Sequence, residues 1–293
     1  MSRSTPRVPD PETFKASQRE LWSDVAAGWR KWWRIFEAGA QPLSDRMVEL
    51  ARVGPGARVL DVATGIGEPA LTAARVVGAK GGVLGTDLAP QMVALASERA
   101  RELGLAHAEF RELDAERLDV PPASFDVALS RWGIMLVMDS AAVLRGMHRA
   151  LVPGGRVVAA VWGAKGTVPF MTIAGDVAQA ELGLPPASPE LPGPLKLGRL
   201  GQLAELLRAA GFESVEEERV ETVLAFASAQ EYVAFLQDLS ATLRRALEEH
   251  PPAARERVWA GVAREAERHR AADGRIVFRN EVRVAHGARP RGA

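Results

Sequence analysis

The sequence predicts an α/β fold: a mostly parallel, seven-stranded sheet with helices on both faces and a helical lid at the N-terminal end. Short runs rich in apolar and β-branched residues alternate with helical patterns through the middle of the chain, which is typical of parallel strands joined by crossover helices. The composition, 47% hydrophobic and 25% charged over 293 residues, suits a soluble globular protein with a sizeable core. The expected strands cover residues 58–62, 82–87, 108–113, 125–130, 156–162, 213–226 and 276–285.

Helices are expected before, between and after these strands. Residues 12–52 read as helix, with an apolar stripe that includes Trp29, Trp33 and Phe36. A second helix begins near Pro90, which suits a first turn, and ends at Gly104. Its stripe is expected to face the sheet and to continue to Leu103.

Breaks in these patterns divide the chain into three regions. The segment VPGGR at 152–156 predicts a turn, and the proline-rich segment 183–198 predicts a loop over one face of the molecule. Charged helices are expected over 228–270, before the last strand. We therefore expect a helical lid at 1–52, a ligand-binding core at 53–163, and a substrate-side loop, helical insertion and closing strands at 164–293.

Charge and cysteine content exclude several classes of function. The formal net charge is zero, so no basic field favours nucleic acid as a partner. The chain has no cysteine, which excludes disulfides and thiolate chemistry. No signal peptide, membrane span or spaced carboxylate cluster for a metal is visible. These observations predict a cytoplasmic protein without a metal, whose partner is a small molecule.

A glycine loop follows the first expected strand. In VLDVATGIGEPA, residues 59–70, Gly65, Gly67 and Ala70 satisfy the Gly-x-Gly-x-x-Gly/Ala pattern of dinucleotide-binding loops. That pattern is a weak match by itself. Ligands of open α/β sheets lie where the carboxyl ends of the strands meet, so residues at the other strand ends decide how to read it.

Carboxylates end the next strands in order. Asp61 can order the loop or meet a cationic amine, Asp87 can accept both hydroxyls of a ribose, and Asp114 can accept from an adenine amino group. The backbone N–H of Ala115 is available to a ring nitrogen. Leu88 and Met92 are expected to wall the adenine plane. The spacing therefore predicts a nucleoside-containing ligand.

Four ordered motifs then carry a resemblance to a known family. VLDVATGIGEPAL, GTDLAPQMV, ELDAERLDVPPASFDVALSRWGIM and MHRALVPGGRVV resemble the class I S-adenosylmethionine-dependent methyltransferases, in particular the ubiquinone and menaquinone biosynthesis branch, over roughly residues 20–285. The resemblance implies a Rossmann-like fold and S-adenosylmethionine as cofactor. It implies that Gly65 and Gly67 pass close to the methionine part, that Asp87 holds the ribose and Asp114 the adenine, and that the loop from Ser130 lies beside the sulfonium. The expected cofactor contacts are Asp61, Ala63, Thr64, Gly65, Gly67, Asp87, Leu88, Met92, Asp114, Ala115 and Ser130.

The loop departs from the family in two ways. Relatives carry a small residue or cysteine before the first loop glycine and often a third glycine soon after, whereas this chain has Thr64 and continues from Gly67 to Glu68 and Pro69. These changes leave the site in place but put its detailed loop contacts in question.

The resemblance also implies the reaction: in-line displacement of a methyl group onto an oxygen, carbon or nitrogen of a small, largely apolar or aromatic acceptor. We expect Trp29, Trp33, Arg131, Trp132 and Met135 to face that acceptor, with Arg131 as the one cation able to orient an anionic group. No residue is assigned as a general base. The alternatives are an NAD(P)-dependent oxidoreductase and a non-catalytic protein that binds S-adenosylmethionine.

Overall fold

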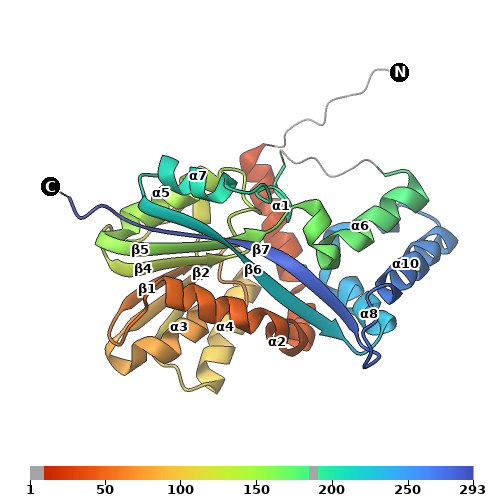
Figure 1. Cartoon of the computed structure of the whole chain (residues 1–293), viewed down its shortest axis with the longest axis horizontal. Coiled ribbons are helices and arrows are strands. Elements are labelled where there is room, and N and C mark those ends of the chain that lie inside the picture. The colour runs from red at the N-terminus through yellow and green to blue at the C-terminus, as the bar shows by residue number, and fades with distance from the viewer. Residues whose placement is uncertain (1–9, 185–190, 293) are drawn as a thin grey trace.

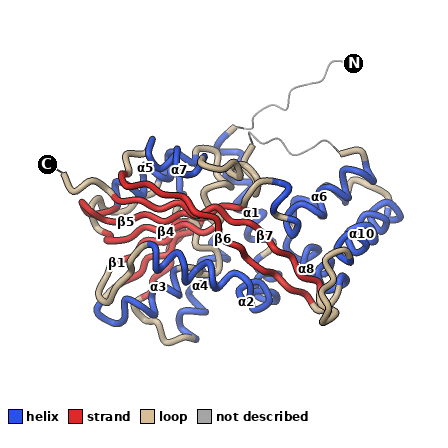
Figure 2. The backbone as a smooth tube through the Cα atoms, viewed as in Figure 1, coloured by secondary structure: helices blue, strands red, loops and turns tan. Residues whose placement is uncertain are grey.

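One seven-stranded sheet organises the molecule. The computed structural model describes residues 10–184 and 191–292. Its strand order is β3-β2-β1-β4-β5-β7-β6, and only β7 runs antiparallel to its neighbours β5 and β6 (Figures 1 and 2). The predicted fold class is confirmed. The strands are β1 (Arg58–Val62), β2 (Gly82–Asp87), β3 (Ala108–Glu112), β4 (Phe125–Arg131), β5 (Leu151–Trp162), β6 (Glu213–Phe226) and β7 (Ile276–Ala288).

The strand order reverses between β1 and β4. From β1 the chain proceeds outwards to β2 and β3, and it then returns to place β4 on the other side of β1. Ligands of open α/β sheets bind at such a reversal, outside the carboxyl ends of the strands. The topology therefore directs attention to the loops that follow Val62 and Arg131.

Helices cover both faces of the sheet (Figure 1). Helices α2, α3 and α4 lie on one face, and α5 and α7 lie on the other. Helices α6, α8 and α10 pack on one another beyond the carboxyl end of β5, beside the extended part of β6 and β7. The helices are α1 (Pro11–Asp24), α2 (Ala26–Leu50), α3 (Ala70–Val77), α4 (Pro90–Glu102), α5 (Ser140–Ala150), α6 (Pro169–Leu182), α7 (Gln202–Ala209), α8 (Ala229–Leu239), α9 (Ala241–Glu248) and α10 (Pro252–Glu267).

The N-terminal segment, expected as one helix, forms two. Helices α1 and α2 meet at the buried Val25. None of the α1 residues is buried, whereas α2 buries one side along its whole length, including Phe36 and Leu43. The two helices therefore differ in how they are held.

Two other expectations are corrected. The segment at 152–156 is part of β5, where the register against β4 shifts between Phe125 and Val127 and Gly154 takes a φ of 81°. It is a bulge within a strand, and not a turn before one. Leu103 lies beyond the end of α4 and is 46% exposed, so it does not extend the apolar stripe. Of the expected loop at 183–198, residues 185–190 lie outside the described residues.

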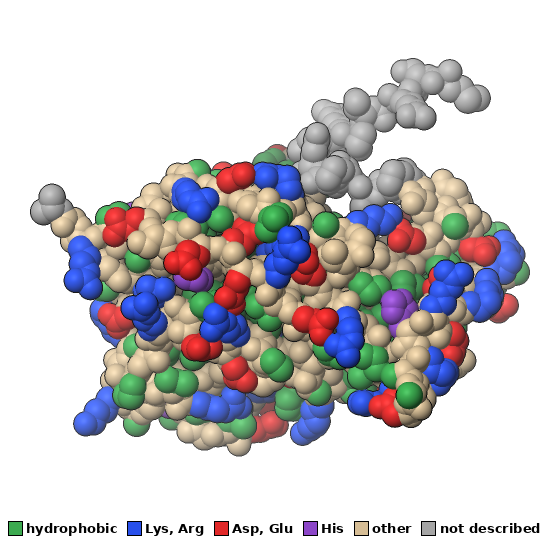
Figure 3. Space-filling view, in the orientation of Figure 1, with side chains coloured by type: hydrophobic (Ala, Val, Ile, Leu, Met, Phe, Trp, Pro, Cys, Tyr) green, Lys and Arg blue, Asp and Glu red, His purple; other side chains and the backbone are tan. Residues whose placement is uncertain are grey.

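The described surface is mixed in charge. Basic and acidic side chains are interspersed over the face shown in Figure 3. Among residues 10–184 and 191–292, no helix has the length and apolar character that a bilayer-spanning segment needs.

Candidate functional site

The glycine loop after β1 adopts the backbone that its glycines permit. Ala63, Gly65 and Gly67 have φ values of 57°, 56° and 102°. A side chain on Gly67 would place its Cβ 2.9 Å from Cδ1 of Leu71, in the first turn of α3. Positive φ and this close approach both favour glycine, so the loop can pass tightly from strand to helix.

Asp61 holds this loop from below. Its fully buried carboxylate accepts hydrogen bonds through Oδ2 from Oγ1 of Thr64 (2.6 Å) and from the backbone N–H of Ala70 (3.1 Å). The other oxygen, Oδ1, is buried and has no partner among the described residues. Burial raises the pKa of Asp61 to about 7, although both hydrogen bonds oppose this. One oxygen therefore orders the loop, and the other is free to accept from a ligand.

Asp87, at the end of β2, closes the loop from the side. Oδ2 accepts from the backbone N–H of Gly65 (2.9 Å), and Oδ1 accepts from that of Ala89 (3.0 Å). Burial raises the pKa of this carboxyl, while the two backbone donors lower it. A carboxylate oxygen has a second lone pair, so both oxygens can still accept from hydroxyls. The contact with a ribose stays a prediction.

Asp114 is paired with a residue that the sequence did not suggest. Its Oδ1 accepts from the backbone N–H of Glu116 (2.9 Å), and its Oδ2 lies 2.7 Å from Nζ of Lys15 in α1. Lys15 also lies 2.7 Å from Oε2 of Glu116. Ala115 opens the short 3-10 turn here. Helix α1 thus covers the carboxylate that was predicted to hold adenine.

An apolar cluster continues this cover. Met92 is buried with Ile66, Ala89 and Leu95, and Trp22 of α1 packs against the same cluster. Leu88, the other expected wall residue, is half-buried and is not a member of this cluster. The predicted adenine wall is therefore apolar at Met92, and α1 lies over it.

The end of β4 meets the glycine loop. A Cβ on Gly133 would lie 2.4 Å from Cβ of Ala63 and 3.1 Å from Oγ of Ser130. Ser130 Oγ and Trp132 Nε1 are both buried and lack a hydrogen-bond partner among the described residues. Trp132 also has a φ of 60°, which is rare for a bulky residue and marks local strain. The glycine loop and the β4 loop therefore meet at a point that contains a strained backbone position and two buried polar atoms without a hydrogen-bond partner.

The expected acceptor residues divide between two clusters. Trp132 stacks on Trp162 of β5 with ring centroids 4.2 Å apart, and Phe36 of α2 meets its edge at 5.4 Å. Trp29 packs on Phe36 at 5.0 Å. Trp33 instead lies under the guanidinium of Arg99, 4.3 Å from its ring centroid, on the predicted cofactor side. The buried Met135 packs in the main core. Contact of any of these with an acceptor stays a prediction.

The expectation for Arg131 is corrected. Its buried guanidinium donates to both oxygens of Glu37 in α2, at 2.8 and 2.5 Å, and to Oγ of Ser44 at 2.8 Å. A guanidinium held by a carboxylate in this two-point geometry already has its counter-charge. Arg131 therefore ties α2 to the end of β4, and it is not a free cation beside the acceptor.

Two other charged side chains of the site were missed. Arg99 of α4 donates to the carbonyl oxygen of Ile66 (2.6 Å) and to Glu68 (3.3 Å), and so braces the glycine loop. The sequence did point to Arg99. An arginine on the apolar stripe of a helix is expected to be buried, and a buried arginine needs a partner. Glu68 lies inside the loop and offers no such signal.

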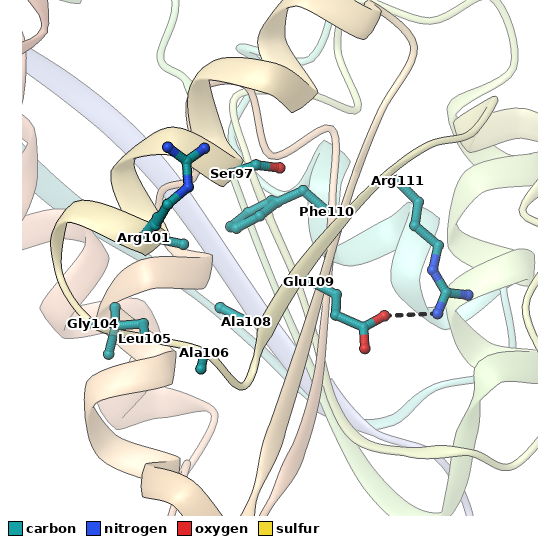
Figure 4. A pocket seen from close by; sticks show the side chains of 10 residues that line it. Ser97, Arg101, Gly104, Leu105, Ala106, Ala108, Glu109, Phe110 and Arg111 are labelled. Atoms are coloured by element: carbon teal, nitrogen blue, oxygen red, sulfur yellow. Dashed lines mark hydrogen bonds and ion pairs between the residues drawn. The ribbon is translucent and has the colours of Figure 1, made fainter.

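Two grooves in the described part of the chain are lined by residues outside the glycine loop and the β4 loop. One groove of about 400 Å³ runs between α4 and β3, and its lining includes Arg101, Phe110 and the ion-paired Glu109 and Arg111 (Figure 4). Its lining begins at Ala106 and follows β3 from Ala108 to Arg111. Within the described ranges, no group of three or more acidic or histidine side chains could hold a metal ion.

Comparisons with known proteins agree with this geometry. Residues 54–181 match the family model described as "Methyltransferase domain". Over 151 residues the chain is 35% identical to the ubiquinone/menaquinone biosynthesis C-methyltransferase of Ectopseudomonas mendocina, a match that covers 50% of this chain and 59% of that protein. An uncharacterized protein of Mycobacterium tuberculosis is 33% identical over 57% of each chain. The matches thus span somewhat over half the length of these curated relatives.

Solved structures extend the likeness to the whole fold. The [4+2]-cyclase SpnF has a TM-score of 0.55 and 26% identity, with 86% of this chain and 82% of that chain covered. A Haemonchus contortus phosphoethanolamine N-methyltransferase, at 20% identity and a TM-score of 0.58, shares the fold over 97% of this chain and 61% of its own. The matched domain, the strand order and the loops at the strand ends together make this chain similar to the class I S-adenosylmethionine-dependent methyltransferases, in sequence over residues 54–181 and in fold over most of its length.

Proposed function

We propose that this protein binds S-adenosylmethionine across the carboxyl ends of β1, β2 and β4 and transfers its methyl group to a small, largely apolar or aromatic acceptor. The observation that carries the proposal is the free oxygen of Asp61. Oδ1 is a buried, unpartnered acceptor directly under the glycine loop. Leaving such an atom unpaired costs about 1–3 kcal/mol, so a donor from a ligand fits there.

The cofactor supplies a methyl group already activated by a sulfonium. In this proposal Oδ1 of Asp61 accepts from the amine of the methionine part, and Asp87 accepts from the ribose hydroxyls. Asp114 accepts from adenine after Lys15 has moved away. Holding the reactants in line accounts for about 7–11 kcal/mol of barrier reduction in well-oriented systems. No general base is assigned.

Two observations support an aromatic or apolar acceptor. Trp132, Trp162 and Phe36 form a buried aromatic cluster next to the β4 loop. Several curated relatives are named as C-methyltransferases of ubiquinone and menaquinone biosynthesis, which favours a ring carbon of a quinol-like molecule.

Calorimetry with S-adenosylmethionine, S-adenosylhomocysteine and NADH tests the cofactor. We expect the first two to bind and NADH not to bind. Asp87→Ala removes two charge-assisted acceptors worth about 1.5–3 kcal/mol each and is expected to weaken binding at least tenfold, with an unchanged circular dichroism spectrum. Glu109→Ala, an exposed acid of β3, is the matched control and should bind as the parent does. Equal affinity in the two variants would contradict the assignment of Asp87.

A second candidate follows from the solved structures. The likeness to the [4+2]-cyclase covers 82% of that protein, more than the 59% of the curated methyltransferase relative. Its named reaction is a cyclisation, so an apolar substrate could be folded and cyclised in the aromatic cluster without loss of the methyl group. Turnover with methyl-labelled S-adenosylmethionine separates the two, because only a methyltransferase moves the label to product.

A further inference from the structure

We infer that Arg283 of β7 binds an anionic oxygen, a carboxylate or a phenolate, on the molecule that this protein acts on. The inference rests on the proposed function and adds the substrate class. Arg283 is 5% exposed, and Nη2 lies 2.6 Å from Oε1 of Glu281. Its Nε and Nη1 are buried and find no partner among residues 10–184 and 191–292. Three N–H donors of a cation are thus left unmet.

The position of Arg283 is fixed by the register of the sheet. Arg283 lies opposite Val161 of β5, one residue before β5 ends at Trp162. It therefore lies at the carboxyl end of β5, the same edge at which the glycine loop and the β4 loop meet. A group held here lies at the carboxyl end of β5, away from β2 and β3, on the sheet face opposite to Trp162 and Phe36, so a ligand that contacts both sides crosses this edge.

The alternation of side chains along β6 and β7 shows to which face of the sheet Arg283 points. Glu217 of β6 and Ala285 of β7 are paired, and Arg219 and Arg283 form the next pair on that face. Glu217 accepts from the backbone N–H groups of Gly201 (2.8 Å) and Ala204 (3.1 Å), at the start of α7. Arg283 consequently points to the face that α7 covers, opposite to α2 (Figure 1).

The same face carries the other unmet polar atom of β4. Ser130, Ala159 and Ala285 are cross-strand neighbours in one row, so Ser130 Oγ and Arg283 project from the same side. Ala159 and Ala285 of that row have only methyl side chains, and Arg283 lies two residues along β7 from Ala285, opposite Val161.

The carboxylate of Glu281 neutralises the Arg283 guanidinium only in part. Glu281 is shared, because its Oε2 also lies 3.8 Å from Nη1 of Arg219 and its Oε1 accepts from Oγ1 of Thr167 at 3.4 Å. Two cations thus share one carboxylate. A buried cation is tolerated when it is paired and hydrogen-bonded, and an oxyanion supplies both needs at Arg283.

The segment around Gly198, which precedes α7, covers the end of β5 next to Glu281. A Cβ on Gly198 would lie 2.5 Å from the carbonyl oxygen of Gly163, the residue after β5. A Cβ on Gly163 would in turn lie 2.9 Å from Oε1 of Glu281. The segment therefore packs closely against the end of β5 beside Glu281, the carboxylate that pairs with the buried Arg283.

The test compares carboxylates with their neutral amides. Benzoate and 2-naphthoate are titrated against benzamide and 2-naphthamide by calorimetry, in the presence of S-adenosylhomocysteine. We expect the parent to bind the carboxylates at least tenfold more tightly, and Arg283→Met to lose that preference. Hydrogen bonds to a charged group account for a tenfold to about hundredfold effect. Arg283→Lys keeps the charge with fewer fixed donors and should recover part of the preference.

Arg219→Met is the matched control, because Arg219 is paired with Arg283 across the strands and shares Glu281 but is 61% exposed at its side chain. It should keep the parent preference. A thermal unfolding midpoint of Arg283→Met equal to or above that of the parent is expected, since a buried group with unmet donors has been removed. A fall of more than about 5 °C would show that the guanidinium serves the fold, and it would overturn the inference.

Failure of this inference and failure of the proposed function are distinguishable. Binding of S-adenosylhomocysteine is measured first in every variant and should not change. If it binds and the carboxylates show no preference over the amides, the role of Arg283 is wrong while the cofactor assignment stands. If it does not bind, the proposed function is wrong, and the carboxylate titrations repeated without it still test Arg283.

Discussion

Helices α1 and α2 are adjacent in sequence, and they are held to the sheet by different forces. Helix α1 buries none of its residues completely and is attached by ion pairs and hydrogen bonds, from Lys15 to Asp114 and from Glu12 to Arg117. Helix α2 has one side inside the core, and its Glu37 forms a buried pair with Arg131 of β4. The Glu12–Arg117 pair is exposed and stabilises little, the Lys15–Asp114 pair is partly buried, and the fully buried Glu37–Arg131 pair is the costliest to break. The comparison teaches that the lid expected over residues 1–52 divides at Val25.

This division gives the two helices different functions in the proposal. Helix α1 covers Asp114 and the cluster around Met92, so it must move to admit a nucleoside. Helix α2 supplies Phe36 to the aromatic cluster and is fixed at the end of β4. We therefore propose α1 as the mobile lid and α2 as a permanent wall.

The largest expected effect is at Glu37. Glu37→Ala leaves the guanidinium of Arg131 buried without its carboxylate, which typically costs about 3–5 kcal/mol. Glu12→Ala removes the corresponding pair of α1, where the side chains of Glu12 and Arg117 are 62% and 70% exposed, and should cost less than about 1 kcal/mol. Urea unfolding gives both free energies of unfolding.

A cost below about 1 kcal/mol for Glu37→Ala would mean that α2 is attached as loosely as α1. The double variant Glu37→Leu/Arg131→Met serves as a control for packing. It removes both charges together, so it should recover most of the stability lost by the single change.

The next effect is in the pH dependence of stability. Burial raises the pKa of Asp61 to about 7, whereas the unfolded chain titrates near 3.8. Between these values the folded state keeps a proton that the unfolded state releases, so the free energy of unfolding falls as the pH rises. The slope contributed is at most about 1.4 kcal/mol per pH unit. This stabilisation is complete below pH 3.8 and is lost as the pH passes through about 7.

Asp61→Asn is expected to remove that slope, measured by urea unfolding from pH 4.5 to 8. Asp24→Asn is the control on α1, where Asp24 is half-exposed and pairs with Arg245. It should leave the pH profile as in the parent. A parent profile without any decrease between pH 5 and 7.5 would contradict the raised pKa of Asp61. It would also show that water reaches the Asp61 carboxyl beneath the glycine loop.

The sequence predicted what local patterns determine. Apolar runs located all seven strands, and the residues that end them located Asp61 and Asp87 around the glycine loop. These features depend on neighbours along the chain: a strand, the turn after it, and glycines where φ is positive. The bulge at Gly154 was missed because a Pro-Gly-Gly run predicts a turn with equal force.

The rest depends on pairs far apart in the chain. Arg131 and Glu37 are 94 positions apart, and Lys15 and Asp114 are 99 apart. A charged residue shows no local sign of which distant partner it will meet, so Arg131 was read as free. The same holds for Arg283, whose unmet donors follow from the way β7 pairs with β5 and β6.

The smallest expected effect sharpens the comparison most directly. Lys15→Met removes the ammonium that joins α1 to Asp114 and Glu116 and keeps most of the side-chain volume. The side chains of Lys15, Asp114 and Glu116 are only 15%, 24% and 8% exposed, so we expect a loss of about 1 kcal/mol, confined to the opening of α1. Hydrogen exchange should become about two- to fivefold faster in residues 11–24 and stay unchanged in residues 26–50. Addition of S-adenosylhomocysteine should then slow exchange in α1 alone. If exchange in the two helices instead rose and fell together, α1 and α2 would open as one unit, and the division at Val25 would have no dynamic meaning.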